Sequence, residues 1–298
     1  GRVADAVIVV AYVISVALYL RIMAQYIVGF FNSAGSALWE PIIACVAVAA
    51  IVAIGVTRGF RGLDLLDRVS IVAVLLLTTL LGCVLLLHDG AEVAAGALRL
   101  PPIPSVAPIS ALLVLGGIVI TVQGFETVRY LGDHFDAPTR VKASRLAQII
   151  ATFIYVTFVA VATPVMGLGT PAGDDITLLD ITARIAPWLA LPLALSAVLS
   201  QFSAAIADTA AAEGNLRGLG RWFTGSRPYL VSGAAAILLA ALVPTLIIVT
   251  IASQAFAAYY GIQAVIALRT SAKPLTKVGF GVLAIGMFAV AIFAQPVS

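Results

Sequence analysis

Charged side chains are scarce in this sequence. Only 10% of its 298 residues are Asp, Glu, Lys or Arg, whereas soluble domains carry about 25%. Because soluble proteins cover their surfaces largely with charged and polar groups, so few charges cannot cover a soluble domain of this length. The composition therefore excludes an ordinary soluble enzyme and predicts a protein whose solvent is lipid.

Cysteine and histidine are also rare, with two residues of each. Cys45 and Cys83 lie inside apolar runs, where a lone Cys behaves as a small hydrophobic residue. His88 and His134 have no Cys or second His at ligand spacing, so no metal site is expected. No nucleophile–His or paired-carboxylate arrangement has catalytic spacing, and we expect neither enzyme activity nor a cofactor.

Long apolar runs, by contrast, fill the chain, and 62% of its residues are hydrophobic. A transmembrane helix needs roughly 20 consecutive apolar residues. The gaps between the runs are too short for a separate soluble domain, so we predict an all-α polytopic membrane protein, one bundle covering residues 1–298. The nine expected transmembrane segments are 3–31, 38–57, 65–88, 107–131, 146–166, 188–213, 229–243, 245–268 and 277–295.

The basic residues between these segments are distributed unevenly. If successive gaps lie on alternate sides of the membrane, one side receives fourteen Lys and Arg residues and the other two, with Arg21 left inside a segment. Cytoplasmic loops carry the excess of basic residues, so we expect a cytoplasmic N-terminus in a cytoplasmic membrane. These residues orient the chain in the lipid bilayer and form no nucleic-acid-binding patch. The fourteen are Arg2, Arg58, Arg61, Arg68, Arg129, Arg140, Lys142, Arg145, Arg217, Arg221, Arg227, Arg269, Lys273 and Lys277, and the two are Arg99 and Arg184.

Polar residues interrupt the fourth segment at about its middle. Gln123, Gly124 and Glu126 follow a hydrophobic run, and a Gly between two polar residues weakens a helix. Broken helices of this kind line substrate sites in transporters, because their freed backbone groups bind polar ligands. The alternative is that Gly124 permits close helix packing while Glu126 bonds to a neighbouring helix.

The sixth segment contains a carboxylate at membrane depth. Asp208 and Thr209 offer adjacent oxygen ligands that suit Na⁺, with Ser203 on the same segment, and Asp208 alone suits a proton. Asp208 also lies nine residues before Arg217, so a plain ion pair with this cytoplasmic residue is the alternative.

Tyrosines mark two further faces. Tyr12, Tyr19 and Tyr26 recur every seven residues and share one face of the first segment, and Tyr259 lies beside Tyr260 in the eighth. A packing stripe accounts for such spacing at least as well as a pore lining does. We keep Tyr12, Tyr19 and Tyr259 as pore-lining candidates.

The residues around Gly124 resemble the amino acid, polyamine and organocation (APC) transporter superfamily. The sixth helix of that family is broken at a Gly-Phe-Glu sequence, which Gly124, Phe125 and Glu126 match. An Asn-Pro-x-Arg motif follows about a dozen residues later in the family, and Ala137 to Arg140 stand at that place with Ala instead of Asn. The stretch 61–68 is similar to the loop entering the family's fifth helix, and 215–221 to the end of its eighth.

This resemblance implies an inverted-repeat (LeuT-like) fold with an incomplete first repeat. Residues 1–106 correspond to family helices 3–5, residues 107–268 to helices 6–10, and residues 269–298 to helix 11. The chain is then expected to lack the first two helices and the last one. Because the broken first helices of the two repeats face each other across the site, a chain without one of them is expected to be inactive on its own.

The resemblance also implies a function. The expected protein is a secondary transporter of amino acids or related organic amines, driven by Na⁺ or H⁺ or by exchange, with Gln123, Gly124, Phe125 and Glu126 at the substrate site. Asp208, Thr209 and Ser203 are the expected ion-coupling residues. A membrane sensor or scaffold without transport is the alternative, and it would carry a polar soluble module that this sequence does not show.

Overall fold

The computed structural model describes residues 2–31, 36–57, 64–101, 107–131, 135–166 and 178–296. All secondary structure within these ranges is helical, which confirms the all-α prediction. The helices are α1 Arg2–Phe30, α2 Ser36–Thr57, α3 Asp64–Ala94, α4 Pro108–Gly117, α5 Ala137–Met166, α6 Leu178–Ile185, α7 Pro187–Leu219, α8 Arg227–Leu242, α9 Thr245–Thr270 and α10 Pro274–Phe293. Two 3₁₀ segments, η1 Val119–Val122 and η2 Phe125–Leu131, follow α4.

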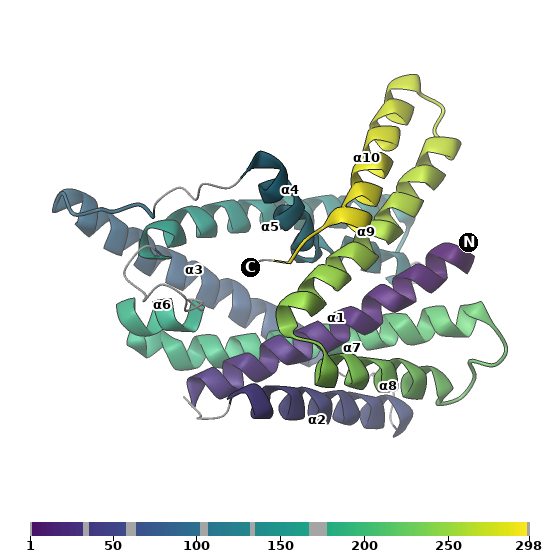
Figure 1. The fold of residues 1–298 in the computed structure, drawn as a ribbon, viewed down its shortest axis with the longest axis horizontal. Helices are drawn as coiled ribbons and strands as arrows, with labels where there is room; N and C mark the ends of the chain where they lie inside the picture. Colours follow the sequence, from purple (N-terminus) through teal and green to yellow (C-terminus); the bar gives the residue numbers. More distant parts are fainter. Residues whose placement is uncertain are drawn as a thin grey trace.

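Helix α1 is the centre of the bundle. It packs against α7, α9, α2 and α8, and it crosses the middle of Figure 1 as a purple ribbon. In the most apolar stretch of α1, 61% of the residues are buried inside the bundle. The corresponding share for α10 is 6%, because α10 packs mainly against α9. The α1 face that carries Ile8, Tyr12 and Leu20 is fully enclosed. Helix α1 is therefore the most buried helix of the bundle.

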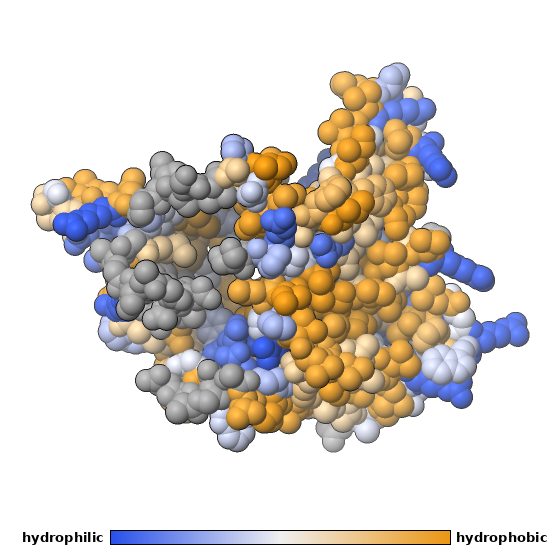
Figure 2. Space-filling view, viewed as in Figure 1, coloured by the Kyte–Doolittle hydropathy of each residue, from blue (hydrophilic) through white to orange (hydrophobic). Residues whose placement is uncertain are grey.

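The peripheral helices present apolar side chains outward. Val72 and Leu76 of α3, and Phe153 and Val156 of α5, are all more than half exposed. Figure 2 shows apolar residues across the middle of one face and hydrophilic residues at the helix ends on its right-hand side. Such an extended apolar exterior is stable only in lipid. The chain is a multi-pass membrane protein.

Seven described helices are long and apolar enough to cross a membrane, or eight if the bent pair at α4 is one span. The prediction of nine spans is therefore confirmed only in part. The expected segment 229–243 forms α8, but this helix has 16 residues and is about 24 Å long, short of the roughly 30 Å hydrocarbon core. Pro244 stops it, because a residue that precedes a proline is disfavoured in the helical conformation.

Helix α5 begins at Ala137, nine residues before the predicted segment. Asp136 caps it, since its Oδ1 accepts the backbone N–H of Thr139 at 3.1 Å. The basic residues of its first turns lie beyond the apolar run, which is why hydropathy placed the start too late. Hydrogen bonds from the Thr139 hydroxyl and from this Thr139 amide lower the pKa of Asp136.

Acidification is expected to loosen the first turn of α5. Because the pKa of Asp136 is lower in the folded chain than in the unfolded one, the stabilisation by its carboxylate is present at neutral pH and is lost as the pH falls below about 4. Hydrogen–deuterium exchange at the Thr139 amide should accelerate over that range. In Asp136→Asn this exchange should be pH-independent after correction for the intrinsic rate, and an unchanged acid response there would contradict the assignment.

Candidate functional site

The fourth predicted segment is broken at the expected place. Regular helix ends at Gly117, η1 covers Val119–Val122, and Gln123 and Gly124 belong to no helix before η2 begins. The two halves are bent by 55°. Gly124 has φ +109°, a backbone conformation that side-chain-bearing residues rarely adopt. The predicted interruption of helical hydrogen bonding near Gly124 is confirmed, and it begins a few residues earlier, at Ile118.

Side chains from neighbouring helices form hydrogen bonds with the backbone groups that the break leaves without helical partners. Ser253 of α9 is fully buried, and its Oγ donates to the Gly117 carbonyl at 2.8 Å while accepting the Ile120 N–H at 3.0 Å. The Tyr155 hydroxyl of α5 donates to the Thr121 carbonyl at 3.0 Å. A break inside a membrane needs such partners, because lipid offers none.

Removing the Ser253 hydroxyl should destabilise this break. Ser253→Ala leaves a buried carbonyl and a buried N–H unpaired, which costs roughly 1–3 kcal/mol each at most. We expect a clearly lower unfolding temperature of the purified protein in detergent. Ser232→Ala is the matched control, since the buried Ser232 hydroxyl bonds only to carbonyls of its own helix, Pro228 at 2.8 Å and Tyr229 at 3.3 Å. Equal shifts in the two variants would contradict the bridging role of Ser253.

Glu126 is the charged group at the break. Its Oε2 accepts the Gly124 N–H at 3.0 Å and the Tyr260 hydroxyl of α9 at 2.8 Å. The Phe125 ring stacks on Tyr260 with ring centroids 4.9 Å apart. Glu126 is only 9% exposed, and its Oε1 has no hydrogen-bond partner among the described residues. A carboxylate held by two donors is fixed in place, with one oxygen left to accept.

Gln123 joins the break to α1. Its side-chain amide donates to the Tyr19 hydroxyl, and its Oε1 is a second buried acceptor without a partner in the described part of the chain. An open cavity of about 310 Å³ adjoins Phe125 and Glu126, with Arg140 and Tyr259 on its wall. The substrate-site candidates Gln123 to Glu126 thus share one place, and what they offer a ligand there is acceptor oxygens beside a stacked aromatic pair.

Asp208 and Thr209 both face the interior of the bundle, each 4% exposed. Asp208 is hydrogen-bonded through Oδ2 to the Ser15 hydroxyl of α1 and lies within electrostatic range of Glu126. Thr209 donates to the Ala205 carbonyl at 2.7 Å. The ion pair with Arg217, the alternative from the sequence, is not formed, because Arg217 pairs with Glu213 instead.

The other candidates occupy different surroundings. Ser203 is buried on α7 at 8% exposure. Tyr12 is fully enclosed in the apolar cluster around α1 and packs edge-to-face on Phe256, an arrangement typical of core packing. Tyr19 is bonded to Gln123, and Tyr259 lines the cavity beside Glu126. The tyrosine face of α1 therefore serves packing at one end and the break at the other.

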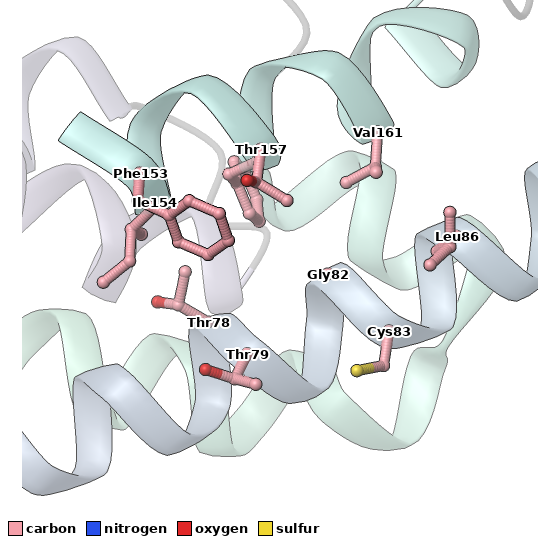
Figure 3. A pocket seen from close by; sticks show the side chains of 10 residues that line it. Thr78, Thr79, Gly82, Cys83, Leu86, Phe153, Ile154, Thr157 and Val161 are labelled. Atoms are coloured by element: carbon pink, nitrogen blue, oxygen red, sulfur yellow. The ribbon is translucent and has the colours of Figure 1, made fainter. Parts of the chain in front are cut away.

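A second cavity, of about 180 Å³, lies between α3 and α5. Figure 3 shows Thr78, Thr79 and Cys83 from α3 facing Phe153 and Thr157 from α5 across it. Its walls are largely apolar side chains at the middle of two peripheral helices. It contains none of the predicted site residues, and it lacks a charged group on its wall.

Two residues that form hydrogen bonds in the candidate site were not predicted from the sequence, Ser15 and Ser253. Ser15 follows Tyr12 by three residues and precedes Tyr19 by four, so helical spacing places it on the same face. That spacing was a usable signal. Ser253 lies in an α9 stretch of small residues, and nothing in the sequence separates it from an ordinary packing serine.

Comparisons with known proteins identify the family. Residues 1–294 match the family described as APC superfamily transporter. An uncharacterized protein of Aquifex aeolicus (strain VF5) is similar over 275 residues at 32% identity, which covers 91% of this chain and 65% of the relative. The chain thus spans slightly less than two thirds of that relative's length.

The family match runs from α1 to the end of α10 and includes both the helix break and Asp208. It therefore covers nearly the whole chain and not one motif alone. The chain belongs to the APC superfamily of transporters.

Proposed function

We propose that this protein is a secondary transporter that carries amino acids or related organic amines across the cytoplasmic membrane, driven by Na⁺ or H⁺ or by exchange. One observation carries the proposal. A membrane helix is broken at Gly124, and the break holds the buried carboxylate of Glu126 with an unpaired oxygen beside an open cavity. Acceptor oxygens in a site of low dielectric favour a protonated amine.

In this proposal, Gln123, Gly124, Phe125 and Glu126 bind the substrate. The ammonium group meets Glu126 Oε1 and Gln123 Oε1, while Phe125 and Tyr260 supply an aromatic wall to the same ligand. Asp208, with Thr209 and Ser203 on the same helix, binds the coupling ion. Tyr19 lies between the two groups, since it bonds Gln123 and is within electrostatic range of Asp208.

The inverted-repeat arrangement belongs to the same proposal. Residues 1–106 then form helices of the first repeat, residues 107–268 the second repeat, and residues 269–298 one further helix. The N-terminus is proposed to be cytoplasmic. Its support is that the N-terminus with Arg2, the α7–α8 connection with Arg221, and the α9–α10 connection with Lys273 lie on the same side of Figure 1, whereas the far end of α3 lies on the other.

Transport by the complete protein in liposomes tests the function. Radiolabelled amino acids and organic amines are offered one at a time, with an imposed Na⁺ gradient, an imposed pH gradient, or unlabelled compound inside for exchange. We expect at least one compound to accumulate above protein-free liposomes in one of these conditions. If none accumulates in any of them, the transport proposal is wrong, and a sensor or scaffold role takes its place.

A further inference from the structure

We infer that Asp208 holds a proton, and that an organic cation binding at Glu126 releases it, so that the protein exchanges protons for its substrate. The inference rests on the proposed transport function and names the coupling ion, the group that carries it and the link to the substrate site. Its basis is that the two carboxyl groups have different hydrogen-bond partners: Asp208 contacts one hydroxyl, and Glu126 accepts two donors.

The Ser15 hydroxyl shows which form Asp208 takes. Ser15 Oγ contacts two oxygens, the carbonyl of Tyr12 at 2.9 Å and Asp208 Oδ2. A hydroxyl has one proton and can donate only once. If Asp208 is a carboxylic acid, its O–H donates to Ser15 Oγ and the Ser15 O–H donates to the Tyr12 carbonyl. Both contacts are then hydrogen bonds, whereas a carboxylate at Asp208 leaves one of them between two acceptors.

Glu126 has the opposite surroundings. Its Oε2 receives two donors, the Gly124 N–H and the Tyr260 hydroxyl. Two donors on one oxygen stabilise the ionised carboxylate. The two carboxyl groups lie within electrostatic range of each other, and like charges in a buried site oppose ionisation of both. A charged Glu126 and a neutral Asp208 therefore form a consistent pair.

The groups that face Asp208 from the surrounding helices offer no positive charge. Ser15 and Tyr19 face it from α1, and Glu126 from η2, and no Lys, Arg or His of the described residues interacts with it. An unpaired carboxylate at membrane depth is costly, whereas the neutral acid is not. This arrangement favours a proton over an ion pair.

The surroundings of Thr209 favour a proton over Na⁺. A cavity lined by Thr209 has a volume of only about 10 Å³, about the room for one water molecule. The Thr209 hydroxyl proton is already donated to Ala205, and Asp208 is 4% exposed. A sodium ion needs several oxygen ligands around it, and a proton needs one oxygen and no added volume.

The coupling follows from the charge balance. An ammonium group bound to Glu126 neutralises the charge that opposes ionisation of Asp208. Ionisation of Asp208 then costs less, with burial as the remaining cost. Where the site is open to water, the O–H bond of Asp208 breaks, the electron pair stays on the carboxylate, and the proton passes to a water molecule. The Ser15 hydroxyl turns from the Tyr12 carbonyl to the new carboxylate. Departure of the cation reverses each step.

Infrared difference spectroscopy of the complete purified protein tests the protonated state. A buried carboxylic acid has a C=O stretch that a carboxylate lacks. We expect this signal at neutral pH, its loss in Asp208→Asn, and its retention in Glu213→Gln, the matched change at the carboxylate paired with Arg217 on the same helix. Ser15→Ala, which keeps Asp208 in place, should shift the signal to higher frequency because one hydrogen bond is lost. A spectrum in which neither Asp208→Asn nor Ser15→Ala alters the acid signal overturns the inference.

Glu126→Gln tests the link without any substrate, because it mimics the neutralised Glu126. Burial of Asp208 is unchanged in this variant, so the expected effect is that the acid signal disappears at a lower pH than in the unmodified protein. An unshifted pH of disappearance means that the two groups are not coupled and overturns the exchange mechanism. Neither measurement involves uptake, so failure of the transport proposal itself is recognised separately, from the liposome assay.

Discussion

Uptake of the transported compound is expected to fall about 100-fold or more when Glu126 is replaced by Gln. The substitution keeps the size of the side chain and removes the charge that receives the substrate ammonium group. A hydrogen bond between charged partners contributes about 1.5–3 kcal/mol. The Gln amide can keep its oxygen on the Gly124 N–H and the Tyr260 hydroxyl, which share one carboxylate oxygen in Glu126, so its NH₂ donor takes the place of Oε1 and opposes the substrate ammonium group. Each 1.4 kcal/mol lost is a tenfold weaker interaction. The measurement is initial uptake into liposomes as a function of substrate concentration.

Two companion variants make this result specific. Glu213→Gln removes a carboxylate of α7 that pairs with Arg217 near the helix end, and uptake should stay within about twofold of the unmodified protein. Tyr260→Phe removes one donor to Glu126 while keeping the stack on Phe125, so its loss should be intermediate. Uptake by Glu126→Gln at the unmodified level would show that the substrate does not meet this carboxylate.

The second large effect is expected from Gly124→Ala. The position has φ +109°, which an L side chain adopts at a cost of roughly 1–3 kcal/mol, and no atom lies within 4 Å of the added methyl carbon. The whole effect is therefore backbone strain and not a clash. We expect the segment to relax toward regular helix, which removes the freed N–H of Gly124 from Glu126 and lowers uptake at least tenfold.

Gly225→Ala is the matched control for this substitution. Gly225 also has a positive φ, of 60°, with nothing within 4 Å of an added carbon, but it lies in the α7–α8 connection far along the chain from the break. A left-handed residue costs roughly 1–2 kcal/mol, so both variants should unfold at somewhat lower temperature. Only Gly124→Ala should lose uptake. Equal uptake by the two variants would contradict a functional break.

The positions of most membrane helices were predictable from the hydropathy of the sequence. Long apolar runs predicted α1, α2, α9 and α10 to within three residues at each end, because a helix satisfies the backbone of an apolar run in lipid. Helices α3 and α7 begin within one residue of the prediction and end six residues later than predicted. The start of α5 was not predictable in this way, because Asp136 sets it by capping the helix and a window of average hydropathy does not register a cap. The bounds of α8 were predicted to within two residues, but at 16 residues the helix is shorter than a transmembrane span.

The helix break of the site was predictable because its residue types disfavour a regular helix. Gly124 between Gln123 and Glu126 indicated the break, since glycine weakens a helix wherever it stands. The partners of Asp208 were not predictable to the same degree, because Ser15 is 193 residues away and only the packing of α1 on α7 brings the two together. Long-range pairing of this kind depends on the assembled bundle.

A structure of the complete protein with its transported compound bound tests the central claim most directly. The account predicts density for the compound at the α4–η2 break, with its ammonium group within hydrogen-bond distance of Glu126 Oε1 and its remainder against Phe125 and Tyr260. Density in the cavity between α3 and α5, or elsewhere without contact to Gln123 or Glu126, would contradict it.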